Sequence, residues 1–91
     1  MSTILCKENQ NLAITTSLLI ISLTNMNVDP ASFMLEVGEE LNAEELLEYT
    51  NSISKVLLKV YNKDSDSYKY LWLVNKTLRG WAERGYSVRI V

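Results

Sequence analysis

Apolar residues recur at helical spacing between Ala43 and Asn62, and this is the clearest periodic pattern in the chain. Placed at 100° steps, they fill an arc about 200° wide, and polar side chains fill the remainder. The arc holds Leu46, Leu47, Tyr49, Ile53, Val56, Leu57, Leu58, Val60 and Tyr61. Asn42 is the expected N-cap, with Glu45 completing a capping box. Because the arc is wider than one neighbouring element covers, we expect this helix to be central in a bundle or shared with another subunit.

A second helix is predicted from Tyr68 to Arg84, after the polar, turn-rich segment 62–67. Asp66 or Ser67 is the expected N-cap. Gly85 is well placed to end the helix, because glycine adopts the left-handed conformation at little cost.

The two ends of the chain favour β-structure. Tyr86–Val91 alternates and is rich in β-branched residues, so we expect a strand, for which Thr3–Cys6 is a candidate partner. An uncovered edge of the C-terminal strand would offer a further contact for another chain. The segment Asn11–Met26 is apolar on every side and is interpreted as a buried helix. The alternative is a hairpin that turns at residues 8–11, since the Ile and Thr content favours strands.

Asp29 and Pro30 mark a further helix start, because Asp caps well and Pro suits the first helical position. Together these patterns predict a mainly α fold, a small three- to four-helix bundle with a short C-terminal β-strand. The chain has 91 residues and contains no Pro/Gly/Ser-rich linker, so residues 1–91 are expected to form a single small globular domain.

The charge-free stretch around Leu12–Leu23 is the candidate for a membrane segment or a signal peptide. It contains four hydroxyl residues and is shorter than the roughly 20 apolar residues that a spanning helix needs. It also lacks the basic start and small-residue cleavage site of a signal peptide. We therefore expect no membrane partner. The one unpaired thiol, Cys6, fits a cytoplasmic location.

The composition excludes several kinds of catalytic site. The chain has no histidine, so it has no His-based triad and no imidazole base or metal ligand. Cys6 cannot form an internal disulfide or a multi-cysteine zinc site. The three glycines lie far apart and make no phosphate-binding loop. We expect a protein that is not an enzyme and uses no cofactor or metal.

The formal net charge of −2 is the remainder of two opposed halves. Residues 1–54 carry one basic and eight acidic side chains, and residues 55–91 carry eight basic and three acidic ones. One interpretation is that the halves face each other within the fold. The acidic cluster Glu40, Glu44, Glu45 and Glu48 is explained mainly by the preference of helix N-termini for acids. The alternative is a second acidic surface that docks a basic partner or imitates the phosphates of DNA.

The predicted last helix carries a tryptophan on its polar face. Its apolar arc holds Tyr70, Leu71, Leu73, Val74, Leu78, Trp81 and Ala82. Trp72 lies on the opposite side with Lys76 and Arg79, and Tyr68 is one turn away. Aromatic residues beside Arg and Lys are typical of interface hot spots and of surfaces on which nucleic-acid bases stack. The alternative is that Trp72 packs beneath the N-terminal element or the Ser65–Ser67 turn, with the two cations over its ring.

These features predict a non-enzymatic, protein-binding module that acts as an adaptor, inhibitor or regulator of a partner protein. Its expected contact residues are Tyr68, Trp72, Lys76 and Arg79. Two surfaces of opposite charge would also allow a homo-oligomer, joined head to tail or as a symmetric dimer. A nucleic-acid-binding accessory protein is the alternative, less favoured because the chain is acidic, with a pI near 5.0.

Overall fold

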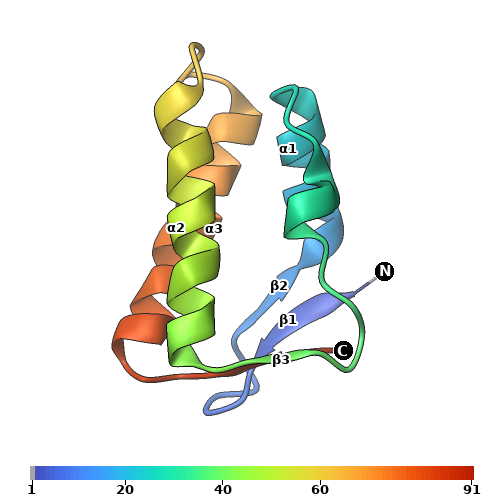
Figure 1. The fold of residues 1–91 in the computed structure, drawn as a ribbon, viewed down its shortest axis with the longest axis vertical. Helices are drawn as coiled ribbons and strands as arrows, with labels where there is room; N and C mark the ends of the chain where they lie inside the picture. Colours follow the sequence, from blue (N-terminus) through green and yellow to red (C-terminus); the bar gives the residue numbers. More distant parts are fainter. Residues whose placement is uncertain (1) are drawn as a thin grey trace.

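The computed structural model describes residues 2–91, which form three α-helices, one short 3₁₀ helix and four β-strands. Their order is β1 (Thr3–Cys6), β2 (Ala13–Thr15), α1 (Thr16–Asn25), η1 (Pro30–Phe33), β3 (Glu40–Leu41), α2 (Ala43–Lys59), α3 (Asp66–Glu83) and β4 (Val88–Ile90). The helices stand side by side and the strands lie across one end of them (Figure 1).

The four strands form one antiparallel sheet in the order β2-β1-β4-β3. Alternate side chains of the two inner strands are buried beneath the helices, namely Ile4, Cys6, Val88 and Ile90. Leu5 and Arg89, directly opposite each other in the register, lie on the outer face. This period of two explains why the ends of the chain pair: each contributes half of a buried apolar strip.

The prediction of a mainly α three- to four-helix bundle is wrong, because this sheet makes the fold mixed α/β. The error lies in Asn11–Met26, which divides between a strand and a helix. Residues 13–15 pair with β1 through a hairpin whose polar turn follows Cys6, and the helix begins only at Thr16. The hairpin alternative and the helix are therefore both present in succession. Ile14 and Thr15 are β-branched and favour the extended part.

The expectation that the C-terminal strand forms an uncovered edge is also wrong. β4 lies between β1 and β3, so both of its sides are hydrogen-bonded. β3 has only two residues, too few to show any periodicity, and it is recruited by pairing with a strand far along the chain. The pairing of β1 with β4 is confirmed.

The predicted helix ends are confirmed at Asn42, Asp29 and Gly85 and are wrong at the end of α2 and the start of α3. Asn42 and Glu45 form a full capping box, and α2 ends at Lys59 rather than at Asn62. Gly85 has the expected positive φ of 79°. The N-cap of α3 is Ser65, whose hydroxyl accepts from the Tyr68 amide, rather than Asp66 or Ser67. Asp29 caps as expected, but the element that Pro30 opens is a single 3₁₀ turn.

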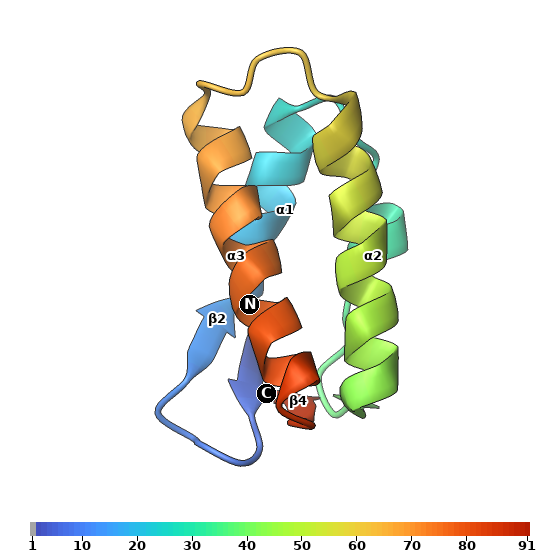
Figure 2. The same ribbon diagram turned by 90° about the vertical axis from the view of Figure 1, so that its left-hand side faces the viewer.

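Helices α2 and α3 run antiparallel and pack closely, and α1 lies behind them, chiefly against α3 (Figure 2). One core joins the helices and the sheet, with buried apolar side chains from β1, α1, η1, α2, α3 and β4. Of the helices formed by residues 2–91, none has the length and apolar character that would let it cross a membrane.

Candidate protein-binding site

Two side-chain contacts join α2 and α3 along one side of the helix pair. Asn75 donates to the Ser54 hydroxyl at 2.9 Å, and one turn further on Arg79 donates to the Asn51 carbonyl oxygen. The Nε of Arg79 is buried. Arg79, a predicted contact residue, is thus held against α2 and serves to fix the helix pair rather than to offer a free cation.

Trp72 lies on this same side of α3, one turn before Asn75, and 47% of its surface is exposed. The Lys76 Nζ lies 5.0 Å from the ring centroid, in the cation–π position. On the outer side a shallow hollow of about 380 Å³ is lined by Tyr68, Lys69, Trp72 and Leu73. Of the predicted contact residues, Tyr68, Trp72 and Lys76 are therefore brought together. Trp72 is thus half-exposed, with one of the two expected cations, Lys76, over its ring.

Leu58 extends this apolar surface onto α2. Asn75 contacts Ser54, and the two helices are antiparallel. The residue one turn after Ser54 on α2 therefore lies level with the residue one turn before Asn75 on α3. Leu58 and Trp72 occupy these two positions, and Leu58 is 81% exposed. We call the surface formed by Leu58, Tyr68, Lys69, Trp72, Leu73 and Lys76 the α3 face.

The wide apolar arc of α2 is only partly covered within the chain. The side chains of α2 that are fully buried are Leu46, Thr50, Ile53 and Leu57. Leu47 and Leu58, at the edge of the arc nearest α3, remain exposed. Leu73 of α3, expected in the core, is likewise 56% exposed. The helix is thus not the enclosed centre of a bundle, and its uncovered edge adjoins the α3 face.

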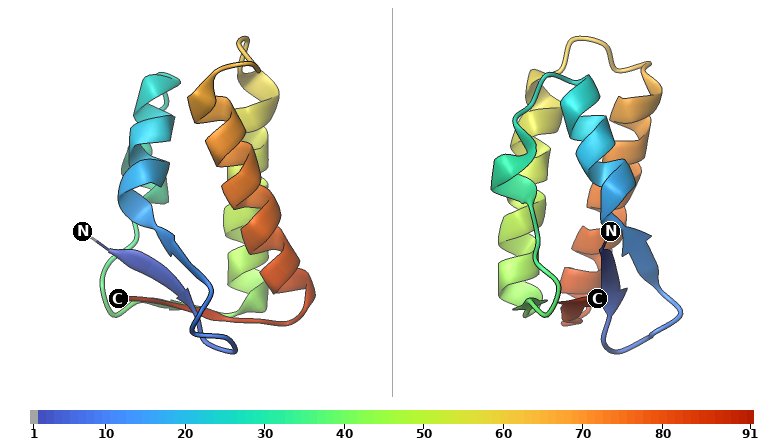
Figure 3. Two further views of the ribbon diagram at one scale, coloured as in Figure 1. Left: turned by 180° about the vertical axis from the view of Figure 1, so that it is seen from behind. Right: turned by 90° about the vertical axis from the view of Figure 1, so that its right-hand side faces the viewer.

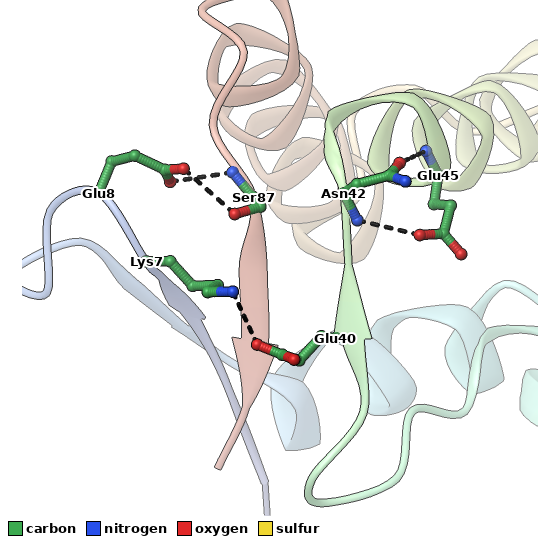
Figure 4. Close-up of polar contacts among 6 residues, drawn as sticks. All are labelled: Lys7, Glu8, Glu40, Asn42, Glu45 and Ser87. Atoms are coloured by element: carbon green, nitrogen blue, oxygen red, sulfur yellow. Dashed lines mark hydrogen bonds and ion pairs between the residues drawn. The ribbon is translucent and has the colours of Figure 1, made fainter.

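The predicted acidic surface is divided by the sheet. Glu40 lies on β3 and forms a salt bridge with Lys7 at 2.8 Å, and Arg89 is its cross-strand neighbour. Hydrogen bonding to Lys7 lowers the pKa of the Glu40 carboxyl below its ordinary value of 4.5. Figure 4 shows Glu40 pointing toward Lys7. Glu45 lies apart from this pair at the start of α2, where its carboxylate accepts from the Asn42 amide. Glu40 is therefore not part of a free acidic surface.

Glu45 and Glu48 instead line a second hollow of about 310 Å³, between the start of α2 and the segment that leads from η1 to β3. Its apolar lining is Met34, Leu35, Leu41 and Tyr49, and Glu39 adds a third carboxylate. The Tyr49 hydroxyl donates to the Phe33 carbonyl oxygen at 2.8 Å, and burial raises its pKa. We call this the acidic hollow. Glu44, the remaining acid of the predicted cluster, lies exposed on α2 outside it.

The two oppositely charged halves of the chain do not neutralise each other through ion pairs. Within residues 2–91, the one salt bridge joins Lys7 and Glu40, which both belong to the first half. Lys69 and Lys76 are exposed on the α3 face, and Glu39 and Glu48 are exposed around the acidic hollow. The charge asymmetry is therefore displayed on the surface.

A third hollow, of about 640 Å³, opens between the ends of α1 and α2. Its lining is Asn25, Met26, Asn27, Val28, Val56, Lys59, Val60, Tyr61, Asn62 and Ser65. The apolar part continues the core, and Lys59 is the one charged side chain of this lining. Beside this apolar part, the lining holds the polar side chains of Asn25, Asn27, Asn62 and Ser65.

Comparisons with protein-family models, curated proteins and solved structures found no match. The candidate site is therefore defined by the geometry of the chain. Sequence reasoning missed Leu58 and Leu73 as surface residues, because each lies at the edge of an apolar arc. The signal for Leu58 was the excess width of that arc, which implied that part of it has no partner within the chain.

Proposed function

We propose that the protein is a small, non-enzymatic binding module whose α3 face docks a partner protein as an adaptor, inhibitor or regulator. The observation that carries this proposal is the half-exposed Trp72, placed level with exposed Leu58 on the neighbouring helix. A tryptophan gains more from burial than any other side chain, so leaving it open is costly unless a partner covers it.

The rim of the face favours an acidic partner. Lys69 borders the hollow and Lys76 lies over the indole ring, so two cations flank the apolar centre. An apolar anchor surrounded by charge is the common arrangement of interface hot spots. The partner segment that fits best carries a large apolar side chain between Asp or Glu residues.

Nucleic acid is the weaker alternative for this face. Stacking of bases on Trp72 would need further cations for the phosphates. Arg79, which would be one of them, is instead engaged with Asn51. The buried, unpaired Cys6 is compatible with the cytoplasmic location that we include in this proposal.

The proposal is tested by titrating the protein with synthetic peptides that carry one Phe or Leu between acidic residues, using fluorescence anisotropy. We expect binding that weakens as salt is raised, and a loss of about 30-fold in affinity for Trp72→Ala. Val37→Ala removes an exposed apolar side chain outside the face and serves as the control. Matched peptides with Lys in place of the acids should not bind.

Two outcomes would contradict the proposal. Equal affinity of Trp72→Ala and the wild type would show that peptides bind elsewhere. Binding of single-stranded DNA or RNA with a steep salt dependence, together with no peptide binding, would favour the nucleic-acid alternative.

A further inference from the structure

The α3 face and the acidic hollow are complementary in both charge and apolar character. The α3 face offers Trp72 and Leu73 between two lysines. The acidic hollow offers exposed Met34, 61% accessible, together with Leu35 and the carboxylates of Glu39 and Glu48. Each surface thus pairs apolar side chains with charges opposite to those of the other surface.

The two surfaces belong to different flanks of the helix pair. The α2 residues of the acidic hollow, such as Glu48 and Ser52, lie on the flank that faces residues 32–41. Asn51 and Ser54 lie on the flank that faces α3. In Figure 1 α2 lies in front of α3 and η1 lies in front of α1, and in the reverse view of Figure 3 α3 comes to the front. One molecule therefore cannot join its own two surfaces.

We propose that the partner of the α3 face is a second copy of this chain, which docks its acidic hollow there in a head-to-tail contact. The inference rests on the proposed function, since it names the occupant of the same site. A symmetric pairing of two α3 faces is disfavoured, because it would bring Lys69 and Lys76 of both copies together.

A head-to-tail contact leaves one free surface at each end of a pair of copies, so it repeats into larger assemblies, either open chains or closed rings. The accessible surface of the molecule is 5672 Å². A stable interface buries about 800 Å² of each partner. The α3 face lies mainly on one half of a single helix and offers less than this area. We therefore expect the association to be weak and reversible.

The test uses two variants that each lose one surface. Trp72→Ala/Lys76→Glu removes the α3 face, and Met34→Ala/Glu48→Lys removes the acidic hollow while sparing the capping residue Glu45. Sedimentation velocity measures the mass of each between about 10 µM and about 1 mM. Lys63→Glu, which reverses a charge in the exposed α2–α3 loop, is the control.

We expect the wild type and Lys63→Glu to grow in mass with concentration beyond the mass of a dimer, and each double variant to stay monomeric. An equimolar mixture of the two variants retains one intact contact, so it should form a 1:1 dimer and nothing larger. Raising the salt to about 0.5 M should weaken the association.

The inference is overturned if the mixture stays monomeric, or if one double variant still assembles by itself. Circular dichroism of each variant checks that it is folded. A wild type that stays monomeric but binds acidic peptides through Trp72 would overturn the head-to-tail contact and leave the proposed function standing, with another acidic protein as the partner. Loss of both the assembly and the peptide binding would overturn the two together.

Discussion

Trp72 and Trp81 belong to the same helix and have opposite environments. Trp81 is 3% exposed and packs in the core, whereas Trp72 lies on the α3 face beneath Lys76. Helical spacing alone separates them, because nine residues turn the helix by 2.5 turns. The side of α3 on which each tryptophan lies could therefore be predicted from the sequence. The exposure of Trp72 could not be predicted, because it depends on how far α2 extends beside it.

Alanine substitutions at Gly80 and Gly85 should change the free energy of unfolding in opposite directions. Both have open space where a Cβ would be, so only the backbone decides the effect of an alanine. Gly80 lies within α3, and Gly80→Ala should raise the free energy of unfolding by about 0.5–1 kcal/mol. Gly85 has φ of 79°, and Gly85→Ala should lower it by about 1–2 kcal/mol. Urea denaturation measures both. Changes of the same sign would contradict the assigned backbone.

Glu8 predicts a pH dependence of stability. Its carboxylate accepts from the Ser87 amide at 2.9 Å and from the Ser87 hydroxyl at 3.1 Å (Figure 4), and the bond from the amide is the main cause of a pKa below 4.5. A carboxyl whose pKa is lower in the folded state stabilises the fold above pH 4.5 and loses this contribution as the pH falls below it.

Glu8→Gln should therefore reduce the stability difference between pH 7 and pH 3, measured by urea denaturation at each pH. Glu36→Gln, a change at an exposed loop carboxyl, is the control. An unchanged difference in Glu8→Gln would show that the contact with Ser87 does not persist in solution.

At the scale of elements, α2 was predictable because its limits are encoded by neighbouring residues. Asn42 and Glu45 exchange hydrogen bonds at 2.8 and 3.1 Å, and no distant contact is needed to begin the helix there. β3 is the opposite case, since two residues hold no pattern and only β4 defines them as a strand. The division at Thr16 between β2 and α1 lies between these extremes. Pairing with β1 makes residues 13–15 a strand, although their apolar character suits a helix as well.

The capping box of α2 supplies an element-scale prediction. Asn42→Ala removes the acceptor for the Glu45 amide and should cost about 1 kcal/mol of unfolding free energy. Ser52→Ala, in the exposed middle of the same helix, should change stability by less than about 0.5 kcal/mol. Chemical denaturation compares the two. Equal effects would contradict a capping role for Asn42.

At the scale of the whole molecule, the small net charge conceals two surfaces of opposite sign. The acidic half follows in part from helix starts, as the sequence indicated, but Glu40 turns to Lys7 while Glu48 stays at the acidic hollow. Which carboxylates remain available could not be predicted, because it depends on the pairing of β3 with β4. In the basic half, Arg79 contacts Asn51 of α2, whereas Lys69 and Lys76 stay beside Trp72. These lysines flank Trp72 on one helix, where spacing alone sets their positions.

The docking role of Trp72 is the central claim, and acrylamide quenching of tryptophan fluorescence tests it most directly. Trp81 is buried, so the readily quenched emission belongs to Trp72. Adding a saturating amount of an acidic peptide with one apolar anchor should protect this emission from acrylamide, and the Lys-substituted peptide should not. Trp72 emission that stays fully quenchable when the acidic peptide is bound would contradict the account.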